Sequence, residues 1–593
     1  MSRSVLRQSL VLVLATTALL LSASAAQGAG GWTKVVSGGF GNPNNTYFPD
    51  SAVFRGCLYV STISSPGATM FSGSSKAGGE VWRSRDGASW KRVVKPGFGD
   101  RENIAIRLAV FGDRLYALAD NSQKGFSAWV SSDGLTFRRL GAPGFGNSER
   151  GLAQPFVFSG RLLLGVARSP GGAEIWASDD GEHFREVVKG GLGDKGNTGI
   201  EMMRFNDGAE SRVEPVLDGT LYVGTSNPTS GGEVWRTNDG LTWERVADNG
   251  LGRRTNIGLA PEVTFDGQVY VAGTGFKGLD SLGVDVFRSA DGTSWEKVVS
   301  NGFNAGLHRN TFAFLAVFKN ALYLVTSSQD PRVLTPPHPS ERFALHGFEL
   351  RRSTDGVSWK RIGTEGFGNS TSFLATLELN ASLELNKDQL YLAATDYRRG
   401  GSVWRTNDGT RWTRIFHEPK ASMFNEGLDA FAYQGRLLVF SNDLASGAAI
   451  WRSGFEVGGG HGSETTTTAT TETESTETST TTETESTETT TTTTSTSSGD
   501  GESSNDGGGG GGSTLAWLIA AGLGGALAAG AAVFFGLRRS RGGSAAAGSA
   551  QSSATSESSA AAAQSSRFCA GCGKEFIADA RFCPNCGRPR EAG

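Results

Sequence analysis

Short apolar runs recur in pairs along residues 32–453, with a turn signal between the two runs of each pair. In the pair at 52–60, Ala52-Val53-Phe54 and Leu58-Tyr59-Val60 flank a turn that contains Gly56. Comparable pairs occupy 109–118, 156–166, 216–224, 263–272, 316–325, 385–393 and 431–440. This pattern predicts a series of β-hairpins.

A second kind of hairpin follows each of the first kind and contains an Asp-Gly turn between aromatic residues. Seven copies read aromatic-x-[Ser/Thr]-x-Asp-Gly-x-x-[Trp/Phe], with one exception at the first position, and their aspartates are Asp86, Asp133, Asp180, Asp239, Asp291, Asp355 and Asp408. The Asp carboxylate can accept hydrogen bonds from nearby backbone N–H groups, while Gly supplies a positive φ. The aspartates are 47 to 64 residues apart, which is the period of a four-stranded propeller blade.

An eighth copy is divided between the two ends of the region. Ile450-Trp451-Arg452-Ser453 supplies its first half, and Trp32-Thr33-Lys34-Val35-Val36 supplies its second half. We therefore expect the strands around Trp32 and Trp451 to pair and to close a ring. The predicted fold is an all-β, eight-bladed β-propeller over 31–457. Seven blades or a partly open ring are alternatives, because the sixth unit has Arg351 in place of the aromatic residue and carries an insertion at 330–348.

At this point the sequence resembles the Asp-box (BNR-repeat) β-propellers, over residues 32–453. That family includes sialidases and many non-catalytic surface proteins. The resemblance therefore implies a type of β-hairpin and carries little information about catalytic activity. Two features depart from the family. The turn has one residue fewer between Asp and Gly than the usual Asp-box, and the Arg-Ile-Pro motif that sialidases carry near the first blade is absent.

The repeat also places most of the large aromatic side chains. Twelve of the 13 tryptophans lie at two repeat positions, and six of the nine tyrosines share one position, at 59, 116, 222, 270, 323 and 391. Regular placement of this kind predicts packing of blade against blade, in preference to stacking on a ligand.

The segments outside the propeller predict a single-pass protein of the cell membrane. Residues 1–28 read as a secretory signal peptide, with an uncleaved anchor as the alternative. Residues 458–513 form a Thr-, Ser-, Glu- and Gly-rich stalk, which is either glycosylated or a bare spacer. Residues 514–537 carry no charge and are long enough to cross a bilayer, and the arginines that begin the linker at 538–566 place the C-terminus in the cytoplasm. Gly522, Ala526 and Gly530 offer a face for a homodimer, although chance also explains their spacing.

The C-terminal residues 567–590 contain two Cys-x-x-Cys pairs, formed by Cys569, Cys572, Cys583 and Cys586. This spacing predicts a structural Zn²⁺ site and resembles the small zinc-ribbon tails of many prokaryotic proteins. Two disulfides are the competing interpretation, which a cytoplasmic location disfavours. The ribbon either contacts a cytoplasmic protein or only caps the tail. Cys57 lies alone on a propeller strand and is expected to be buried.

The predicted ligand-binding surface is the mouth of the ring. Connections between blades that begin Gly-[Phe/Leu]-Gly place Asn five residues after the aromatic or Leu residue, and neighbouring strands carry polar residues that vary from blade to blade. The candidates are Asn45, Asp50, Asn103, Arg107, Arg150, Gln154, Asn197, Asn256, Glu262, Asn310, Asn425 and Asp429. For the asparagines, stabilisation of the turn is the alternative that we favour.

The sequence favours a non-catalytic propeller that binds an extracellular glycan, cell-wall component or protein. The region around the ring is near neutral in charge, which argues against nucleic acid as a partner. One alternative is a sialidase-like glycoside hydrolase, whose nucleophile would have to come from the irregular tyrosines Tyr47, Tyr397 and Tyr433. The other is a transmembrane sensor that uses the zinc ribbon for cytoplasmic contacts.

Overall fold

The computed structural model describes residues 27–28, 31–64, 77–168, 170–201, 203–206, 211–278, 280–328, 346–368, 372–379, 388–396, 400–418, 425–443 and 446–457. The predicted stalk, membrane helix, linker and zinc ribbon lie outside these residues, as does the predicted signal peptide except Gln27 and Gly28. Within the described ranges, no helix has the length and apolar character needed to span a membrane.

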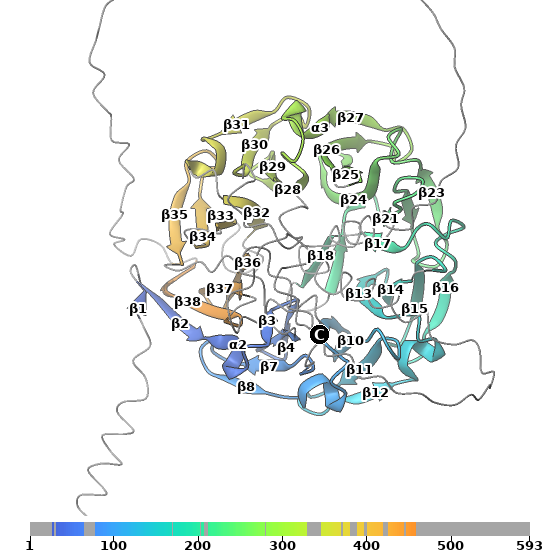
Figure 1. The fold of residues 1–593 in the computed structure, drawn as a ribbon, viewed down its shortest axis with the longest axis vertical. Coiled ribbons are helices and arrows are strands. Elements are labelled where there is room, and N and C mark those ends of the chain that lie inside the picture. Colours follow the sequence, from blue (N-terminus) through green and yellow to red (C-terminus); the bar gives the residue numbers. More distant parts are fainter. Residues whose placement is uncertain are drawn as a thin grey trace, which may run out of the picture. The chain divides into compact units, whose positions relative to one another are not determined.

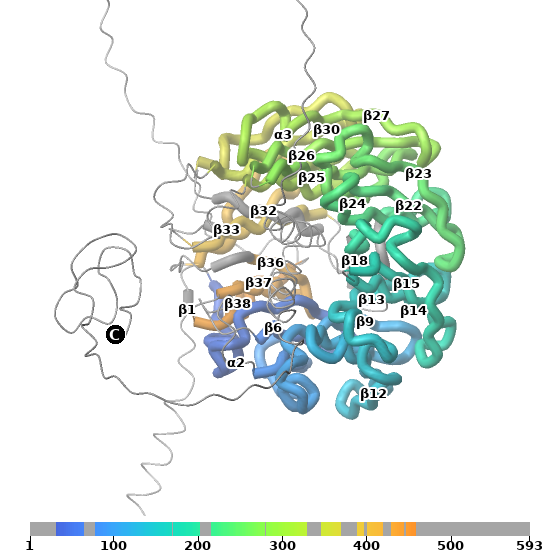
Figure 2. Tube along the Cα trace, turned by 45° about the vertical axis from the view of Figure 1, so that its right-hand side comes forward, coloured from blue at the N-terminus to red at the C-terminus, as the bar shows by residue number. Residues whose placement is uncertain are grey.

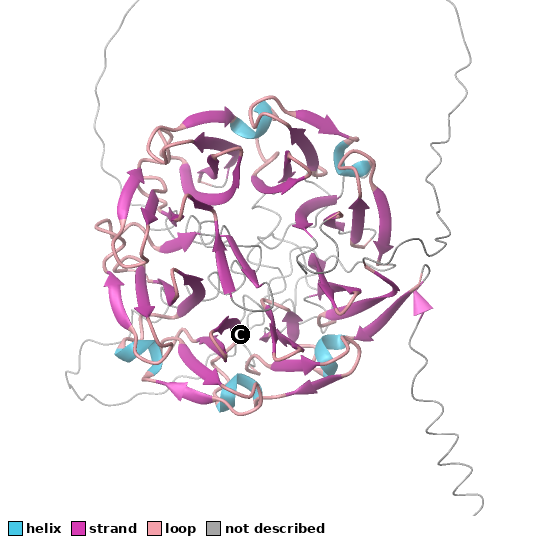
Figure 3. Ribbon diagram, turned by 180° about the vertical axis from the view of Figure 1, so that it is seen from behind, coloured by secondary structure: helices cyan, strands magenta, loops and turns pink. Residues whose placement is uncertain are grey.

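The described chain folds as an all-β propeller, whose antiparallel blades stand around a common centre (Figures 1 and 3). The strands of each blade are given from the innermost outward. The first blade consists of β4 (Ser51–Phe54), β5 (Cys57–Ser61), β7 (Val81–Ser84) and β8 (Trp90–Arg92), and the second of β9 (Ala105–Phe111), β10 (Arg114–Asp120), β11 (Ser127–Ser131) and β12 (Arg138–Leu140). The third consists of β13 (Leu152–Phe158), β14 (Arg161–Ala167), β15 (Glu174–Ser178) and β16 (Arg185–Val188).

The next two blades share one sheet. They consist of β17 (Gly199–Glu201) and β20 (Val216–Leu217) beside β21 (Thr220–Ser226), β22 (Val234–Thr237) and β23 (Glu244–Ala247), and of β24 (Asn256–Phe265), β25 (Gln268–Lys277), β26 (Asp280–Ser289) and β27 (Glu296–Val299). Two further blades consist of β28 (Phe312–Phe318), β29 (Ala321–Ser327), β30 (Glu349–Ser353) and β31 (Lys360–Ile362), and of β32 (Ser372–Leu379), β33 (Leu390–Asp396), β34 (Ser402–Thr406) and β35 (Thr413–His417).

The last sheet combines strands from both ends of the described region. It contains β36 (Asn425–Tyr433), β37 (Arg436–Asp443), β38 (Ala449–Glu456), β2 (Trp32–Val36) and the short β1 (Gln27–Gly28). Strands β2 and β38 pair antiparallel, with Trp32 opposite Ser453 and Lys34 opposite Trp451. The predicted pairing of these two strands is therefore confirmed, and Figure 2 shows β38 beside the N-terminal strands.

The tyrosine repeat packs one blade against the next. Tyr59 of β5 is fully buried, and a Cβ atom on Gly134, in the Asp-Gly turn of the following blade, would lie 1.9 Å from its hydroxyl oxygen. The same relation joins Tyr116 to Gly181, Tyr222 to Gly292, Tyr270 to Gly356 and Tyr323 to Gly409. Between the last and first blades, Leu438 and Tyr433 pack against Gly87. The tyrosines thus have the packing role that their placement predicts.

The Asp-Gly turns have the hydrogen bonds expected of them. In the turn at Asp408, one carboxylate oxygen accepts hydrogen bonds from the backbone N–H groups of Thr410 and Arg411, both at 2.8 Å, and from the Thr406 hydroxyl at 3.2 Å. The two N–H groups lower the pKa of Asp408 to about 2, because they stabilise its ionised form. These aspartates are therefore part of the scaffold.

The connections between blades adopt tight left-handed turns, which appear as the short helical segments α2 (Gly38–Gly41), η2 (Pro96–Gly99), η3 (Pro143–Gly146), α3 (Asn301–Asn304) and η6 (Glu365–Phe367). In the first of them, Gly39 and Phe40 both have positive φ, and the Phe40 ring stacks on Trp82 with a centroid distance of 4.2 Å. Phe98 stacks on Trp129 in the same way. The third-strand tryptophans therefore pack against the incoming connection, as predicted.

One insertion lies near the centre of the ring. Between β17 and β20, strands β18 (Met203–Asn206) and β19 (Ser211–Glu214) form a hairpin, and β19 adds to the preceding blade by pairing with β13. Strand β18 contacts β4 and β24, and β19 contacts β9 and β24 (Figure 1). A smaller extension joins β3 (Asn45–Tyr47) and β6 (Ile63–Ser64) to the inner edge of β9.

Gly134→Ala should destabilise the full-length protein more than Gly160→Ala. Both glycines have φ near 70°, but a Cβ atom on Gly160 would meet no atom within 4 Å. The left-handed backbone alone should cost about 1–2 kcal/mol in either variant. Overpacking against Tyr59 should add about 1–3 kcal/mol in Gly134→Ala. Urea unfolding followed by tryptophan fluorescence measures both, and equal costs would contradict the packing role of Tyr59.

Candidate functional site

The predicted mouth residues are hydrogen-bonded inside their own loops. Six of them are buried, and each donates from its side chain to the carbonyl oxygen of the glycine that begins the left-handed turn, at 2.9–3.3 Å: Asn45 to Gly39, Asn103 to Gly97, Arg150 to Gly144, Asn197 to Gly191, Asn256 to Gly250 and Asn310 to Gly302. The turn interpretation is confirmed for these loops. The side chain of Asn425 lies outside the described residues.

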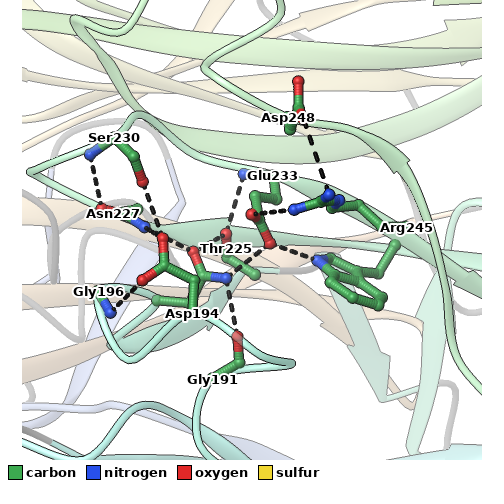
Figure 4. A network of polar contacts seen from close by, with 11 residues as sticks. Gly191, Asp194, Gly196, Thr225, Asn227, Ser230, Glu233, Arg245 and Asp248 are labelled. Carbon is green, nitrogen blue, oxygen red and sulfur yellow. Dashed lines mark hydrogen bonds and ion pairs between the residues drawn. The ribbon is translucent and has the colours of Figure 1, made fainter.

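Most of these side chains also bind a carboxylate that the sequence analysis did not single out. Figure 4 shows this network around Glu233, which precedes β22. Its carboxylate accepts hydrogen bonds from Asn197 at 2.7 Å, from the Trp235 indole at 2.8 Å and from Arg245 at 3.1 Å. The Thr225 hydroxyl donates to Asn197 and accepts from the Glu233 N–H. We call this arrangement the blade tie, because it joins the third and outer strands of one blade to the connection from the preceding blade.

The blade tie recurs around the ring. Its carboxylates are Glu80, Glu174, Glu233, Asp285 and Glu349, each two residues before the third-strand aromatic residue or its replacement. Glu80 binds Asn45, Trp82 and Arg92, for example. In the last blade, Glu418 binds Trp451 from another part of the chain. The signal was present in the sequence as a repeated acidic residue before the aromatic position.

Arg351, the irregular residue of the sixth unit, keeps the contacts of the aromatic residue that it replaces. Its guanidinium group lies 3.8 Å from the centre of the Phe303 ring in the preceding connection. It also donates to Glu349 at 2.7 Å. An arginine can stack on an aromatic ring and bind a carboxylate at once, so this position belongs to the scaffold.

Polar side chains that are not part of the blade ties lie on the innermost strands or directly beside them. Five of them were predicted, namely Asp50, Arg107, Gln154, Glu262 and Asp429, and two were not, namely Asp120 and Glu201. Glu201 could have been found, because it follows Asn197 by four residues, as Arg107 follows Asn103. Asp120, at the end of β10, has no such signal. Asp50 accepts a hydrogen bond from the Leu108 N–H at 3.0 Å, which joins two blades near the centre.

Glu201 and Glu262 come from neighbouring blades that approach closely. Glu201 on β17 lies opposite Gly224 of β21, and β24 pairs with the same strand through Gly258 and Ser226. A Cβ atom on Gly224 would lie 1.5 Å from the carbonyl oxygen of Leu259, so only glycine permits this approach. Glu262 follows at a β-bulge in β24, and such bulges redirect side chains.

Burial dominates the titration of both carboxyl groups, and the charge of Glu201 also affects Glu262. Burial raises the pKa of Glu262 to about 8; the Leu315 N–H group opposes this shift, and the charge of Glu201 adds to it. Burial also raises the pKa of Glu201 to about 7, against a hydrogen bond from the Ser226 hydroxyl. One oxygen of each group, Oε2, has no hydrogen-bond partner in the part of the chain that the structure describes.

The remaining candidate residues offer little scope for catalysis or metal binding. Tyr433 donates its hydroxyl proton to backbone carbonyl oxygens of the first blade, Gly56 at 3.0 Å and Arg85 at 3.1 Å, so it serves the scaffold. Burial raises the pKa of Asp429 to about 6. Among the described residues, no group of three or more His, Cys, Asp and Glu side chains could hold a metal ion. Cys57 is buried, as expected, and the four predicted zinc ligands lie outside the described residues.

Comparison with known proteins finds no matching family model and no matching curated protein. Solved structures resemble the chain at low identity. A prolyl endopeptidase is 11% identical with a TM-score of 0.38, over 66% of this chain and 54% of its own. The polysaccharide lyase Uly1 is 12% identical with a TM-score of 0.36, over 69% and 90%. A Trypanosoma rangeli sialidase is 12% identical with a TM-score of 0.29, over 69% and 54%.

The expectation of a non-catalytic binding propeller is contradicted by these comparisons, because the resembling structures are mostly enzymes: prolyl endopeptidases, a puromycin-hydrolysing peptidase, a lyase and a sialidase. The chain spans only about half the length of the prolyl endopeptidase and of the sialidase, at 54% of each. These similarities concern the fold alone, and they identify no substrate for this chain.

Asn197→Ala should destabilise the protein by at least about 2 kcal/mol, because it leaves the buried Glu233 carboxylate and Gly191 carbonyl short of a donor. Asn238→Ala is the matched control, since Asn238 is exposed and lies two residues before the next turn glycine. Its cost should stay within about 0.5 kcal/mol. Urea unfolding of the full-length protein measures both values, and similar costs would contradict the blade tie.

Stability should fall as the pH rises from 5 to about 8.5. The pKa values of Asp120, Glu201, Glu262 and Asp429 are raised to about 7, 7, 8 and 6. The folded state therefore holds protons that the unfolded state has released, and this stabilisation is complete below pH about 4 and lost through pH 6–8. The urea midpoint, measured across this range, should decline in the wild-type protein.

Glu262→Gln supplies the control for this pH dependence. It removes the carboxyl group with the highest pKa of the four, so the decline of the urea midpoint above pH 7 should become shallower. A wild-type midpoint that rises between pH 5 and 8.5 would show that these carboxyl groups are ionised in the folded protein.

Proposed function

We propose that the propeller is a glycoside hydrolase that uses Glu201 and Glu262 as its pair of catalytic carboxyl groups. The observation that carries this proposal is that two buried carboxyl groups lie on β17 and β24, neighbouring strands of adjacent blades, and that the charge of Glu201 contributes to the raised pKa of Glu262. Hydrolysis of a glycosidic bond needs one protonated and one ionised carboxyl group. A pair with separated titrations supplies both forms.

Their surroundings support separate roles. Glu262 has the higher pKa, so it would keep its proton and donate it to the glycosidic oxygen as general acid. Glu201 accepts a hydrogen bond from Ser226, which favours its ionised form, and it would act as nucleophile or as the base that activates water. Each group keeps one oxygen without a partner among the described residues, and this oxygen would engage the substrate or water.

The rest of the chain supports display of this enzyme outside the cell. We place it in an eight-bladed ring of the Asp-box type, closed by β2 and β38, on the stalk at 458–513 and the membrane helix at 514–537. On the cytoplasmic side, Cys569, Cys572, Cys583 and Cys586 would hold a structural Zn²⁺ ion.

The test is a screen of the full-length protein against a panel of 4-methylumbelliferyl glycosides that includes the sialoside. We expect turnover of at least one substrate, with a bell-shaped dependence on pH whose limbs follow the titrations near pH 7 and 8. Glu262→Gln and Glu201→Gln should each lower kcat at least about 100-fold, since each removes a proton-transfer or nucleophilic group.

Glu296→Gln is the matched control. Glu296 lies on the outer strand β27, where it binds Arg288, and its loss should leave kcat unchanged. If the wild-type protein turns over no glycoside, or if both inner variants retain full activity while folded, the proposal is wrong.

A further inference from the structure

Arg107 and Asp120 form a second buried polar site on the blade next to β4–β8. Arg107 lies on the innermost strand β9 and Asp120 at the end of β10. In the pairing of these strands, Arg107 lies opposite Leu118 and Asp120 opposite Ala105, so both side chains are on the same face. They are 3% and 0% exposed, respectively.

Much of the hydrogen-bonding capacity of this pair is not used by the residues that the structure describes. The closest approach, from Arg107 Nε to Asp120 Oδ2, is 3.9 Å, which is too long for a hydrogen bond. Arg107 Nε and Nη2 and both carboxylate oxygens of Asp120 have no hydrogen-bond partner among the described residues. The Ala153 N–H group lies near Asp120 and opposes the rise in its pKa, but it does not form a bond of normal geometry with either oxygen.

Other buried ion pairs of the ring differ from this one. Arg150 and Glu174 approach to 2.6 Å, and Lys297 and Asp285 to 2.9 Å, with further donors on each carboxylate. Those pairs belong to blade ties. A buried charged group without hydrogen bonds is costly, and four unpaired atoms in one pair indicate that another molecule completes the site.

We propose that Arg107 and Asp120 bind adjacent hydroxyl groups of a sugar ring. A hydroxyl group can accept a hydrogen bond from the guanidinium group and donate one to the carboxylate, so a vicinal diol satisfies both residues. The assignment rests on the proposed glycoside hydrolase activity and makes this pair a specificity-determining subsite of that substrate.

The position of the pair fits an extended substrate. The backbone of β19 contacts both β9, which carries Arg107, and β24, which carries Glu262. Strands β9 and β24, from different blades, therefore both contact the same hairpin. The diol would belong to a sugar ring that is held away from the bond being cleaved, so that loss of Arg107 affects binding more than the chemical step.

The test compares hydrolysis of aryl glycosides with hydrolysis of their monodeoxy analogues by the full-length protein. Arg107→Lys keeps the positive charge but loses the planar donor group. It should lower kcat/KM for a fully hydroxylated substrate about 10- to 100-fold, mainly through KM, because a hydrogen bond to a charged group is lost. Against the analogue without that hydroxyl group, the variant and the wild-type protein should be equal.

Asp120→Asn is the second variant, since it keeps the shape of the side chain and replaces one acceptor by a donor. It should show the same dependence on the hydroxyl group. Arg185→Lys is the control, because Arg185 is exposed and pairs with Asp179 on the outside of a blade. Thermal unfolding monitors folding of every variant. Equal losses of kcat/KM for all analogues, or no loss, would overturn the subsite.

A binding measurement separates failure of this inference from failure of the proposed activity. Saturation-transfer NMR with methyl glycosides is carried out on Glu262→Gln protein, alone and combined with Arg107→Lys. Binding that Arg107→Lys abolishes, without turnover by the wild-type protein, would support the subsite and reject the hydrolase. Turnover that is unaffected by Arg107→Lys would do the opposite. Absence of methyl glycoside binding together with absence of turnover would reject both.

Discussion

The blade tie is the interaction on which the rest of the structure depends. A buried carboxylate such as Glu233 has several acceptor positions, and the tie fills them with an amide from the incoming connection, an indole from its own strand and a cation from the outer strand. Burying such a charge is favourable only when these donors are all present. In the blades that have it, the tie therefore holds the orientation of the blade relative to the connection before it, and with it the position of the innermost strand.

The scaffold was predictable because it repeats. The tyrosines at one repeat position, the Asp-Gly turns and the pairing of β2 with β38 all follow from comparing units along the chain. The asparagines of the connections repeat for the same reason. Because these asparagines repeat in the connecting loops, the sequence suggested a ring of amides that binds a ligand. In the structure, each loop folds inward, and its amide holds the turn of the same loop.

Features that occur once were harder to predict. The β18–β19 hairpin interrupts a single innermost strand, and no other unit offers a comparison for it. Glu201 precedes this interruption directly and was missed, although its spacing from Asn197 matched that of Arg107 from Asn103. The proximity of Glu201 to Glu262 depends on Gly224, whose missing side chain has meaning only when two blades are seen together. The function could not be read from the repeat, because the repeat builds blades and the chemistry lies where blades differ.

The pairing of β2 with β38 also imposes an order on folding. The strand that begins with Trp32 is made first, yet its partner around Ser453 is made last. Until β2 and β38 pair, the last sheet is incomplete. The indole of Trp32 is then not yet held against the Ile415 carbonyl oxygen, to which it donates in the folded protein. Contacts between distant parts of a chain form slowly, because a long loop must close before they are gained. The chain has to keep its first strand unpaired throughout synthesis of the other blades, which makes assembly of the terminal sheet the step most exposed to misassembly.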